Sequence, residues 1–439
     1  MTAVAYALGV ILFAVGVAVS IGLHEFGHLI PGKLFNVKVT QYFVGFGRTL
    51  WSRQIGETEY GLKAIPLGGY CKLVGMVAPG PDQDESNVRN RKTGMFAQLV
   101  DDARAAEYEH VEPADKDRLF YLKPWWQRVI IMGSGVAINI VLAFILFAIG
   151  FMAIGIDVPT TTVSKVSDCV IAVTSSSVDQ APRRCTDKDP VAPARKAGFR
   201  SGDKIVAING QTITEWSQAQ DAIRANGDQR ASVVVQRDGQ QVTLHPRTVV
   251  TALAGLDNPE TITQAGFLGI LPTTVQQRQD IGYVGSTMAT GTLATLTAIA
   301  HLPPKVYHVA RAALGLEKRS VDSPMSVVGA GRVAGDMASQ SQTPLSSKLL
   351  GLLLLLGGLN LFLGLINLVP LPPFDGGGIA TTLYDAARRG LARLLHRPEP
   401  GVVDVAKLLP VTYVMAAVIL VVSVILIFAD IVAPVSLNS

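Results

Sequence analysis

The sequence predicts an α-helical membrane protein in which four spanning helices carry a β-rich loop and a separate folded module. Hydrophobic residues make up 49% of the 439-residue chain and charged residues only 16%, which is too apolar for an ordinary soluble protein. The apolar residues gather in segments without Asp, Glu, Lys or Arg, each meeting the roughly 20 residues that a spanning helix needs. These segments are Thr2–Leu23, Val129–Ile156, Leu349–Phe374 and Leu408–Ala429.

The first apolar segment is either a cleaved signal peptide or a spanning helix. No Lys or Arg precedes it, and it lacks a clear small-x-small cleavage site. It also carries the strongest catalytic motif in the chain, which is described below. We therefore expect this segment to be retained as a membrane span.

The distribution of Lys and Arg predicts the orientation of the spans, because these residues gather in cytoplasmic loops. None occurs before Lys33 and none after Lys407, so both termini are expected outside the cytoplasm. The loop 31–124 and the arginine-rich stretch 388–397 then lie in the cytoplasm, and the long loop 157–348 faces outside. The net charge of +4 is too small to indicate a nucleic-acid partner.

The cytoplasmic loop divides into an apolar and a polar part. Residues 37–77 alternate and break like strands, with Gly and Pro between them, so this part is expected to be β-rich and associated with the membrane. Residues 79–117 are polar and charged and are expected to be mobile. Two tryptophans and an arginine in Pro124–Arg128 mark the membrane interface where the second span begins.

The outer loop contains a compact module over residues 157–274. Its sequence predicts a short helix, tight turns and strands, with a second helix over Trp216–Ala225 and a hairpin turn at Asp238–Gly239. The pattern A-x-x-A-G-x-x-x-G-D-x-I-x-x-I-N-G, which begins at Ala194, resembles PDZ domains of the bacterial protease type. Such domains bind extended peptides by strand addition. A plug that shields an active site without binding peptide is the alternative.

Two further features belong to the outer loop. Cys169 and Cys185 both lie in it, where a disulfide can persist, whereas Cys71 lies in the cytoplasmic loop and should stay reduced. Two unpaired outer thiols are the alternative to the bridge. The stretch 280–347 is weakly amphipathic and interrupted by Pro303–Pro304, which predicts helices on the outer membrane surface.

His24, Glu25 and His28 form an HExxH motif at the end of the first span. Positions i and i+4 of a helix share a face, so both imidazoles can reach one metal ion while Glu25 stands beside it. Ionisable residues within a spanning helix are costly to bury and are usually functional. The motif therefore predicts a metal site that needs a third ligand from elsewhere in the chain.

Asp375 is the candidate for this third ligand. It lies at the end of the third span in the pattern N-x-x-P-x-P-x-x-D-G-G, which begins at Asn367. A helix cannot continue through these prolines, so the span must unwind there, and broken backbone at membrane depth is tolerated where it is buried or lines a polar cavity. The charge distribution places both motifs near the cytoplasmic face, which supports a common site.

The HEFGH motif in the first span and the N-x-x-P-x-P-x-x-D-G-G pattern in the third together resemble the site-2 proteases, which are intramembrane zinc metalloproteases. One PDZ-like module between the second and third spans resembles the regulator-of-sigma-factor proteases of bacteria. The segments Gly68–Tyr70, Gly133–Asn139 and Ser323–Val327 are also similar to the family. The resemblance covers nearly the whole chain outside residues 79–117 and implies a multi-pass protein of the bacterial inner membrane.

The resemblance also implies the chemistry of the site. One zinc ion per chain would be held by His24, His28 and Asp375, with water in the open fourth position. Glu25 would take a proton from this water and later pass it to the leaving amine.

Substrate contacts are predicted at two places. Asn367, and with less support Asn139, would hold the substrate backbone or the oxyanion; a helix cap and a bond between helices are the respective alternatives. A helical substrate hides its peptide bonds in hydrogen bonds and must unwind before cleavage. The strands in 37–77 offer an edge that can hold an unwound segment as an added strand, or they form a small sheet that only caps the site.

The leading functional hypothesis is cleavage of single-span membrane proteins, by resemblance an anti-sigma factor already trimmed by another protease. Clearance of leftover signal peptides would need the same site. A zinc-dependent scaffold acting through the PDZ-like module would not need Glu25, which is present. A zinc transporter would need several intramembrane carboxylates, and apart from the motif glutamate the spans offer only Asp375.

Overall fold

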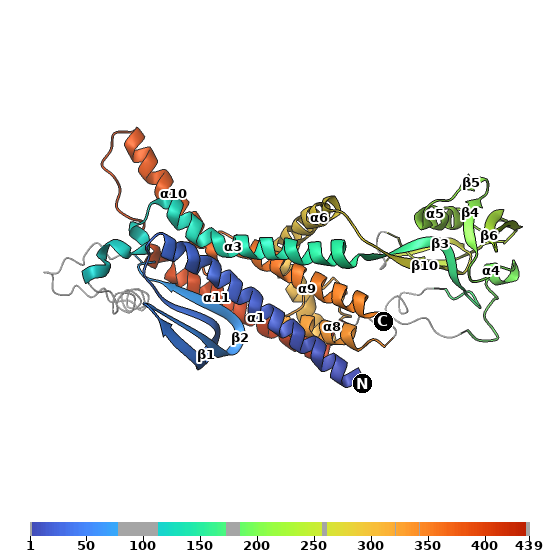
Figure 1. Cartoon of the computed structure of the whole chain (residues 1–439), viewed down its shortest axis with the longest axis horizontal. Coiled ribbons are helices and arrows are strands. Elements are labelled where there is room, and N and C mark those ends of the chain that lie inside the picture. Colours follow the sequence, from blue (N-terminus) through green and yellow to red (C-terminus); the bar gives the residue numbers. More distant parts are fainter. Residues whose placement is uncertain are drawn as a thin grey trace. The chain divides into compact units, whose positions relative to one another are not determined.

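The computed structural model describes residues 2–77, 113–172, 185–256, 261–320, 322–341 and 343–435 (Figure 1). The chain forms two compact units. The first contains Met1–Ala153 and Asp280–Val435, and the second contains Ile154–Gln279. Each unit is described by itself below.

Within the described residues, four helices are long and apolar enough to cross a membrane, which confirms the predicted multi-pass membrane protein. The second of them ends in a π-helical turn, and the fourth begins with a short 3₁₀ turn. They are α1 (Thr2–Leu34), α3 (Trp125–Ala148) with η3 (Ile149–Ile154), α9 (Leu345–Ile366), and α11 (Leu409–Val432) with η4 (Val405–Leu408).

Small residues let α1 approach its neighbours closely, as is usual between helices in membranes. A methyl group on Gly27 would lie 2.8 Å from the Cα atom of Gly135 on α3. Near the other end of α1, a methyl group on Gly9 would lie 2.6 Å from the Cβ atom of Ala338 on α8 (Val327–Ser339). Side chains such as Phe13 then fill the apolar core between α1, α8 and α9.

The third span is shorter than predicted. The apolar segment predicted as this span continues to Phe374, but α9 ends at Ile366 and Asp375 begins a separate helix, α10 (Asp375–Leu394). The prolines between the two helices lack the N–H group that a helix needs and clash with the preceding turn. The unwinding expected at this pattern is therefore present. α10 covers part of residues 377–407, for which the sequence predicts a cytoplasmic loop.

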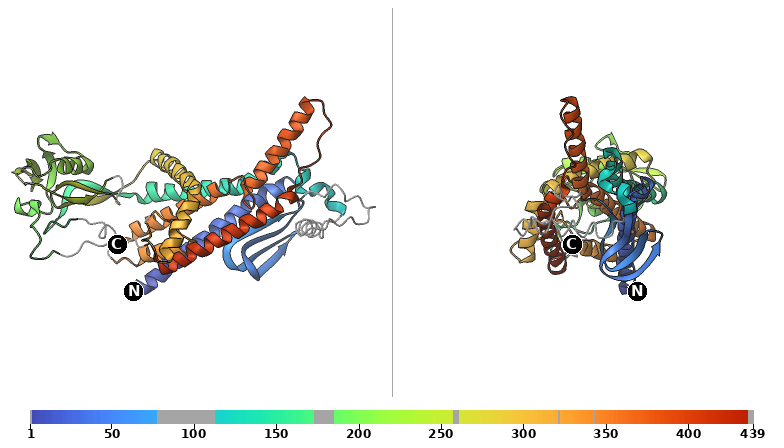
Figure 2. Two further views of the ribbon diagram at one scale, coloured as in Figure 1. Left: turned by 180° about the vertical axis from the view of Figure 1, so that it is seen from behind. Right: turned by 90° about the vertical axis from the view of Figure 1, so that its left-hand side faces the viewer.

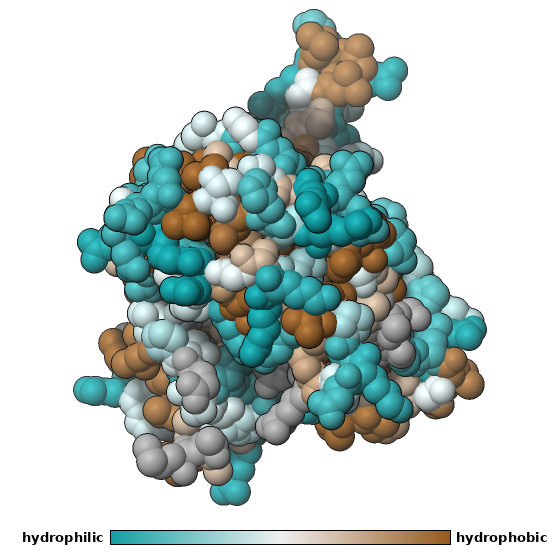
Figure 3. All heavy atoms as spheres, turned by 90° about the vertical axis from the view of Figure 1, so that its right-hand side faces the viewer, coloured by the Kyte–Doolittle hydropathy of each residue, from teal (hydrophilic) through white to brown (hydrophobic). Residues whose placement is uncertain are grey.

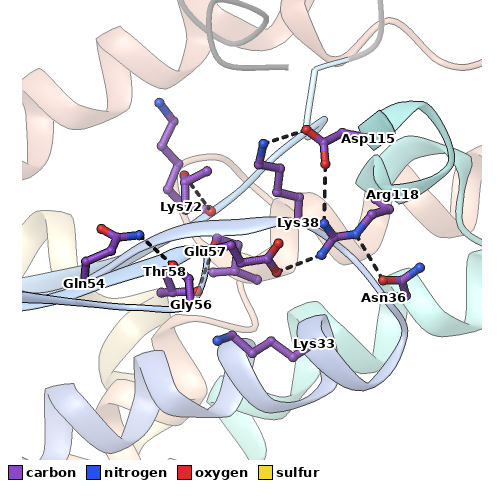
Figure 4. Close-up of polar contacts among 12 residues, drawn as sticks. Lys33, Asn36, Lys38, Gln54, Gly56, Glu57, Thr58, Lys72, Asp115 and Arg118 are labelled. Atoms are coloured by element: carbon purple, nitrogen blue, oxygen red, sulfur yellow. Dashed lines mark hydrogen bonds and ion pairs between the residues drawn. The ribbon is translucent and has the colours of Figure 1, made fainter. Parts of the chain in front are cut away.

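Two long, bent strands, β1 (Val39–Ile55) and β2 (Thr58–Leu73), form the predicted β-rich region. The sheet lies against α1, where the Tyr42 hydroxyl donates to the carbonyl oxygen of Gly22 at 2.7 Å. The expected mobility of 79–117 falls mostly outside the described residues. Its last part forms a 3₁₀ turn, η1 (Pro113–Arg118), and Arg118 binds Glu57 and Asn36 beside the sheet (Figure 4).

The stretch 280–347 contains three helices. α6 (Ile281–Ala300) and α7 (Leu302–Ala313) precede α8, which packs on α1 as part of the helical bundle. Their position on the membrane surface stays a prediction. Between α7 and α8, the buried Arg319 forms an ion pair of 2.6 Å with Asp430 near the end of α11.

The second unit has a mixed α/β core. Its larger sheet has the strand order β10-β3-β4-β6-β7, with β5 paired to β4, and β8 and β9 form a separate hairpin. The predicted helix Trp216–Ala225 and the turn at Asp238–Gly239 are present, and Cys169 and Cys185 are joined by a disulfide. The elements are β3 (Ile156–Val166), α4 (Pro193–Lys196), β4 (Lys204–Ile208), β5 (Gln211–Thr212), α5 (Trp216–Ala225), β6 (Val233–Arg237), β7 (Gln240–Leu244), β8 (Val249–Ala254), β9 (Ile262–Phe267) and β10 (Ile270–Gln277).

Candidate metal centre

The two histidines of the HExxH motif share one face of α1, as their spacing predicts. His24 and His28 are one helical turn apart, and their Nε2 atoms lie 3.4 Å from each other. His28 is buried and His24 is partly buried, so the pair faces the interior of the helical bundle. The local helix alone therefore provides two converging nitrogen ligands.

Asp375 joins this pair from the start of α10. Its Oδ2 atom lies 3.3 Å from Nε2 of His24 and 3.3 Å from Nε2 of His28. The following glycines make the tight turn possible, because a methyl group on Gly376 would overlap the carbonyl oxygens of Leu368 and Val369. The sequence D-G-G thus lets the unwound segment fold back and present its carboxylate.

The three ligand atoms fit a tetrahedral zinc site. Zinc binds histidine nitrogen and carboxylate oxygen at roughly 2.0–2.2 Å, and tetrahedral angles then separate neighbouring ligand atoms by about 3.3–3.6 Å. The three sides of the observed triangle, 3.3, 3.3 and 3.4 Å, match the lower end of this range. In addition, Oδ2 of Asp375 is buried and has no hydrogen-bond donor in the described part of the chain.

The second nitrogen of each imidazole contacts α3. Nδ1 of His28 lies 2.8 Å from the carbonyl oxygen of Ile131, so Nδ1–H can donate and leave Nε2 free for a metal. Nδ1 of His24 lies 3.2 Å from Nδ2 of Asn139, while Oδ1 of this buried amide has no partner among the described residues. If the amide N and O of Asn139 are exchanged, its Oδ1 atom accepts the Nδ1–H of His24. Nε2 of His24 is then free for a metal as well.

The sequence predicts Asn139 as a substrate contact, with a bond between helices as the alternative, and in the structure its amide contacts His24 on the neighbouring helix α1. Asn367, the other substrate candidate, is the C-cap residue of α9, and its carbonyl oxygen accepts the N–H of Gly376 at 2.7 Å. It therefore adjoins the turn that carries Asp375. The backbone of Asn367 thus caps the helix, as the alternative proposed. Its side chain is half-buried and is still a candidate for contact with the substrate.

Glu25 lies between the metal ligands and the sheet. A methyl group on Gly69 of β2 would lie 2.9 Å from Cγ of Glu25, so glycine permits this close approach of strand and helix. Cys71 follows on the same strand, and burial together with the charge of Glu25 raises the pKa of its thiol to about 12. Its thiol is therefore neutral at physiological pH.

Sequence reasoning missed the role of Gly135. A methyl group on this residue would overlap Nε2 of His28 and lie 3.0 Å from Cε1 of His24. The neighbouring Ser134 donates its hydroxyl hydrogen to the carbonyl oxygen of Gly27 at 2.7 Å, which fastens the same helix crossing. Two glycines in an apolar span can indicate a close helix contact, but the sequence does not say which helix lies opposite.

The fold and the site together define a multi-pass membrane protein with a three-ligand metal site and an adjacent carboxylate, which is the arrangement of a metal-dependent hydrolase. The sequence model of peptidase family M50 matches residues 12–396. The chain is 30% identical to zinc metalloprotease Rip1 of Mycobacterium tuberculosis H37Rv, over 98% of this chain and 99% of Rip1.

Other relatives agree with this assignment. Zinc metalloprotease Rip1 of Mycolicibacterium smegmatis is 32% identical over 98% of this chain and 99% of its own length. The regulator of sigma-W protease RasP of Bacillus subtilis is 22% identical over 86% of this chain and 90% of RasP. The chain belongs to peptidase family M50, and it is a zinc metalloprotease of the site-2 type that acts in regulated intramembrane proteolysis.

Proposed function

We propose that this chain hydrolyses peptide bonds inside the transmembrane segments of single-span proteins, using one zinc ion held by His24, His28 and Asp375. The observation that carries the proposal is the triangle of ligand atoms, whose sides fit a tetrahedral zinc site. Three protein ligands leave one position open, as in catalytic rather than structural zinc sites.

Bound zinc would supply a Lewis acid that polarises the scissile carbonyl and acidifies water. Glu25 accepts the proton of the attacking water and passes it to the leaving amine. The carbonyl oxygen of Ile131 engages the Nδ1 hydrogen of His28, and the amide of Asn139, once its N and O are exchanged, would do the same for His24. Both Nε2 lone pairs would then face the ligand triangle.

The sheet supports binding of an unwound substrate next to Glu25. Residues 69–73 pair with β1 on one side only, and no described strand covers their other side. This edge begins at Gly69, which lies close to Glu25, and the backbone N–H of Cys71 on it donates to the Glu25 carboxylate. A substrate segment added here would exchange its helical hydrogen bonds for strand pairing. A sheet that only caps the site remains the alternative, and it predicts no loss of binding when the edge is blocked.

The substrate class and location follow from the family and the charge distribution. We infer that the protein lies in a bacterial inner membrane with both termini outside, and that its substrate is an anti-sigma factor after a first cleavage. The relative RasP of Bacillus subtilis is named a regulator of sigma-W protease, which supports this class. The second unit, whose sequence resembles a PDZ domain, is assigned to the outer side.

The decisive experiment compares membrane proteins of cells that contain the wild-type enzyme or its Glu25→Gln variant. We expect the variant to keep its zinc and to accumulate a trimmed single-span protein, because only proton transfer is lost. Glu399→Gln, which removes an exposed carboxylate paired with Arg393 on the loop after α10, is the matched control and should cleave as wild type. Cleavage at the wild-type rate by Glu25→Gln would contradict the assigned role. Accumulation of leftover signal peptides alone would favour the alternative substrate.

A further inference from the structure

Helix α10 is amphipathic, and one of its faces packs against α3. On this face Asp385, which is 1% exposed as a side chain, binds Nη2 of Arg128 at 3.0 Å. Nearby, a methyl group on Gly378 would lie 2.9 Å from Cε of Met132, so the two helices are in close contact. The ion pair and the glycine fix the rotation of α10 about its own axis.

The opposite face of α10 is apolar and has no partner in the described part of the chain. Five large side chains on it are between 45% and 74% exposed. Counted from Leu383, they lie at offsets of 0, 1, 8, 11 and 12 residues, which places them within about a third of the helix circumference. They are Leu383, Tyr384, Leu391, Leu394 and Leu395.

The figures show how this face is presented. α10 projects sideways from the bundle of spans (Figure 2, right), and apolar side chains gather on the projecting end at the top of Figure 3. The helix connects two spans, α9 and α11, so it must lie close to the membrane. An exposed apolar face beside a membrane indicates a helix that lies in the interface.

The charges of α10 indicate which lipid headgroups it would bind. Four arginines occur from 386 to 397, two of which, Arg388 and Arg389, share the buried carboxylate of Asp385 with Arg128. With the exposed Glu399, which pairs with Arg393, the segment from 385 to 399 still carries more positive than negative charge. The side chain of Arg393 is 68% exposed, and Arg397 is also exposed. Anionic phospholipids of the cytoplasmic leaflet attract such arginines.

We propose that α10 is an interfacial helix whose apolar face inserts into the cytoplasmic leaflet, with anionic phospholipid headgroups around Arg393 and Arg397. The choice of leaflet rests on the orientation given under the proposed function. Because α10 begins with Asp375, docking on the lipid surface also holds the direction of the helix that presents this carboxylate.

The test uses the full-length chain in nanodiscs, with Glu25→Gln to exclude proteolysis and Cys71→Ser to remove the free thiol. An environment-sensitive dye on Tyr384→Cys should be quenched by lipids brominated on their acyl chains. A dye on Ser217→Cys, exposed in the second unit, is the control. Equal exposure of both dyes to water would overturn the proposal. The readout is independent of cleavage, so failure of the proposed function would not imitate this result.

Two further variants separate the apolar and the ionic contributions. Leu391→Glu should abolish quenching at position 384, whereas Leu391→Met should preserve it. Arg393→Gln with Arg397→Gln should lower the ratio of inserted to exposed probe by about tenfold when phosphatidylglycerol is mixed into phosphatidylcholine discs. It should change little in phosphatidylcholine alone. Insertion that is equally strong in both lipids and unaffected by the arginines would overturn the anionic preference.

Discussion

At the scale of single residues, the proposed metal centre depends on the lack of a side chain at Gly135 as much as on its candidate ligands. Gly135 lies so close to His28 and His24 that no larger residue fits without moving a ring. The protein interior is densely packed, so such a displacement is not easily absorbed. The ligand geometry is thus fixed from the side of α3, on a helix that contributes no ligand.

We expect Gly135→Ala to weaken zinc binding at least about tenfold, because a shift of one ligand distorts the tetrahedral site. Gly133→Ala is a matched control two residues earlier on the same helix, where the nearest atom to an added methyl group would be 3.9 Å away. Chelator competition on the purified proteins measures the difference. Equal zinc affinity in the two variants would show that Gly135 is not essential to the site.

Asn139 is expected to hold the tautomer of His24. Asn139→Leu should lower zinc affinity by roughly 10- to 100-fold, because the Nδ1–H of His24 loses its acceptor. Asn139→Asp should retain zinc, since a carboxylate accepts the same hydrogen. If instead Asn139→Leu keeps full zinc but loses substrate affinity, the substrate role predicted from the sequence is correct.

At the scale of elements, local sequence patterns predicted most of the helices, strands and breaks that position the site. The i, i+4 spacing placed both histidines on one helix face, and the prolines after Asn367 required the break between α9 and α10. The rotation of α3 against α1 could not be predicted, because it depends on contacts between residues far apart in the chain. For that reason the sequence did not indicate Gly135, nor the contact of Asn139 with His24.

The second unit contains a buried ion pair with a predictable response to pH. Burial raises the pKa of Asp203, but hydrogen bonds from Arg237 and the Arg200 backbone outweigh it, so the pKa of this carboxyl lies below its usual value of 3.8. The stabilisation is present above about pH 4 and is lost as the pH falls through the lower pKa of the folded state.

Hydrogen exchange of residues 154–279 in the full-length protein should therefore accelerate as the pH falls below about 4, after correction for the intrinsic exchange rate. Asp203→Asn should exchange faster already at neutral pH and lose this dependence. Asp228→Asn, which disrupts the exposed pair with Arg247, is the control and should have little effect. An unchanged pH profile in Asp203→Asn would refute the assignment.

At the scale of the whole molecule, the second unit is inserted between α3 and α6, and we expect it to limit which substrates are cleaved. Ile205→Asp should unfold this unit, because burying an unpaired charge costs several kcal/mol, comparable with the roughly 5–15 kcal/mol stability of a domain. Cleavage of an untrimmed substrate by this variant would indicate a size filter.

Val250→Asp places the same charge at an exposed position of the second unit and serves as the control. A variant at position 205 that holds zinc in the membrane yet cleaves no substrate of any length would show that the unit recruits substrates. Both outcomes retain Glu25 as the catalytic base, so they test the second unit alone.

If the three residues share one zinc ion, the melting temperature of the membrane bundle depends on the concentration of free zinc. His24 and His28 lie on α1 and Asp375 on α10, and unfolding would separate them, so an ion held by all three would bind the native chain alone. Mass action then adds about 2.7 kcal/mol at a hundredfold excess of zinc over its dissociation constant. The melting temperature in zinc-buffered detergent should rise with the logarithm of free zinc for wild type and Glu25→Gln, and stay flat for Asp375→Ala. A flat curve for wild type would mean that the three residues do not share one ion.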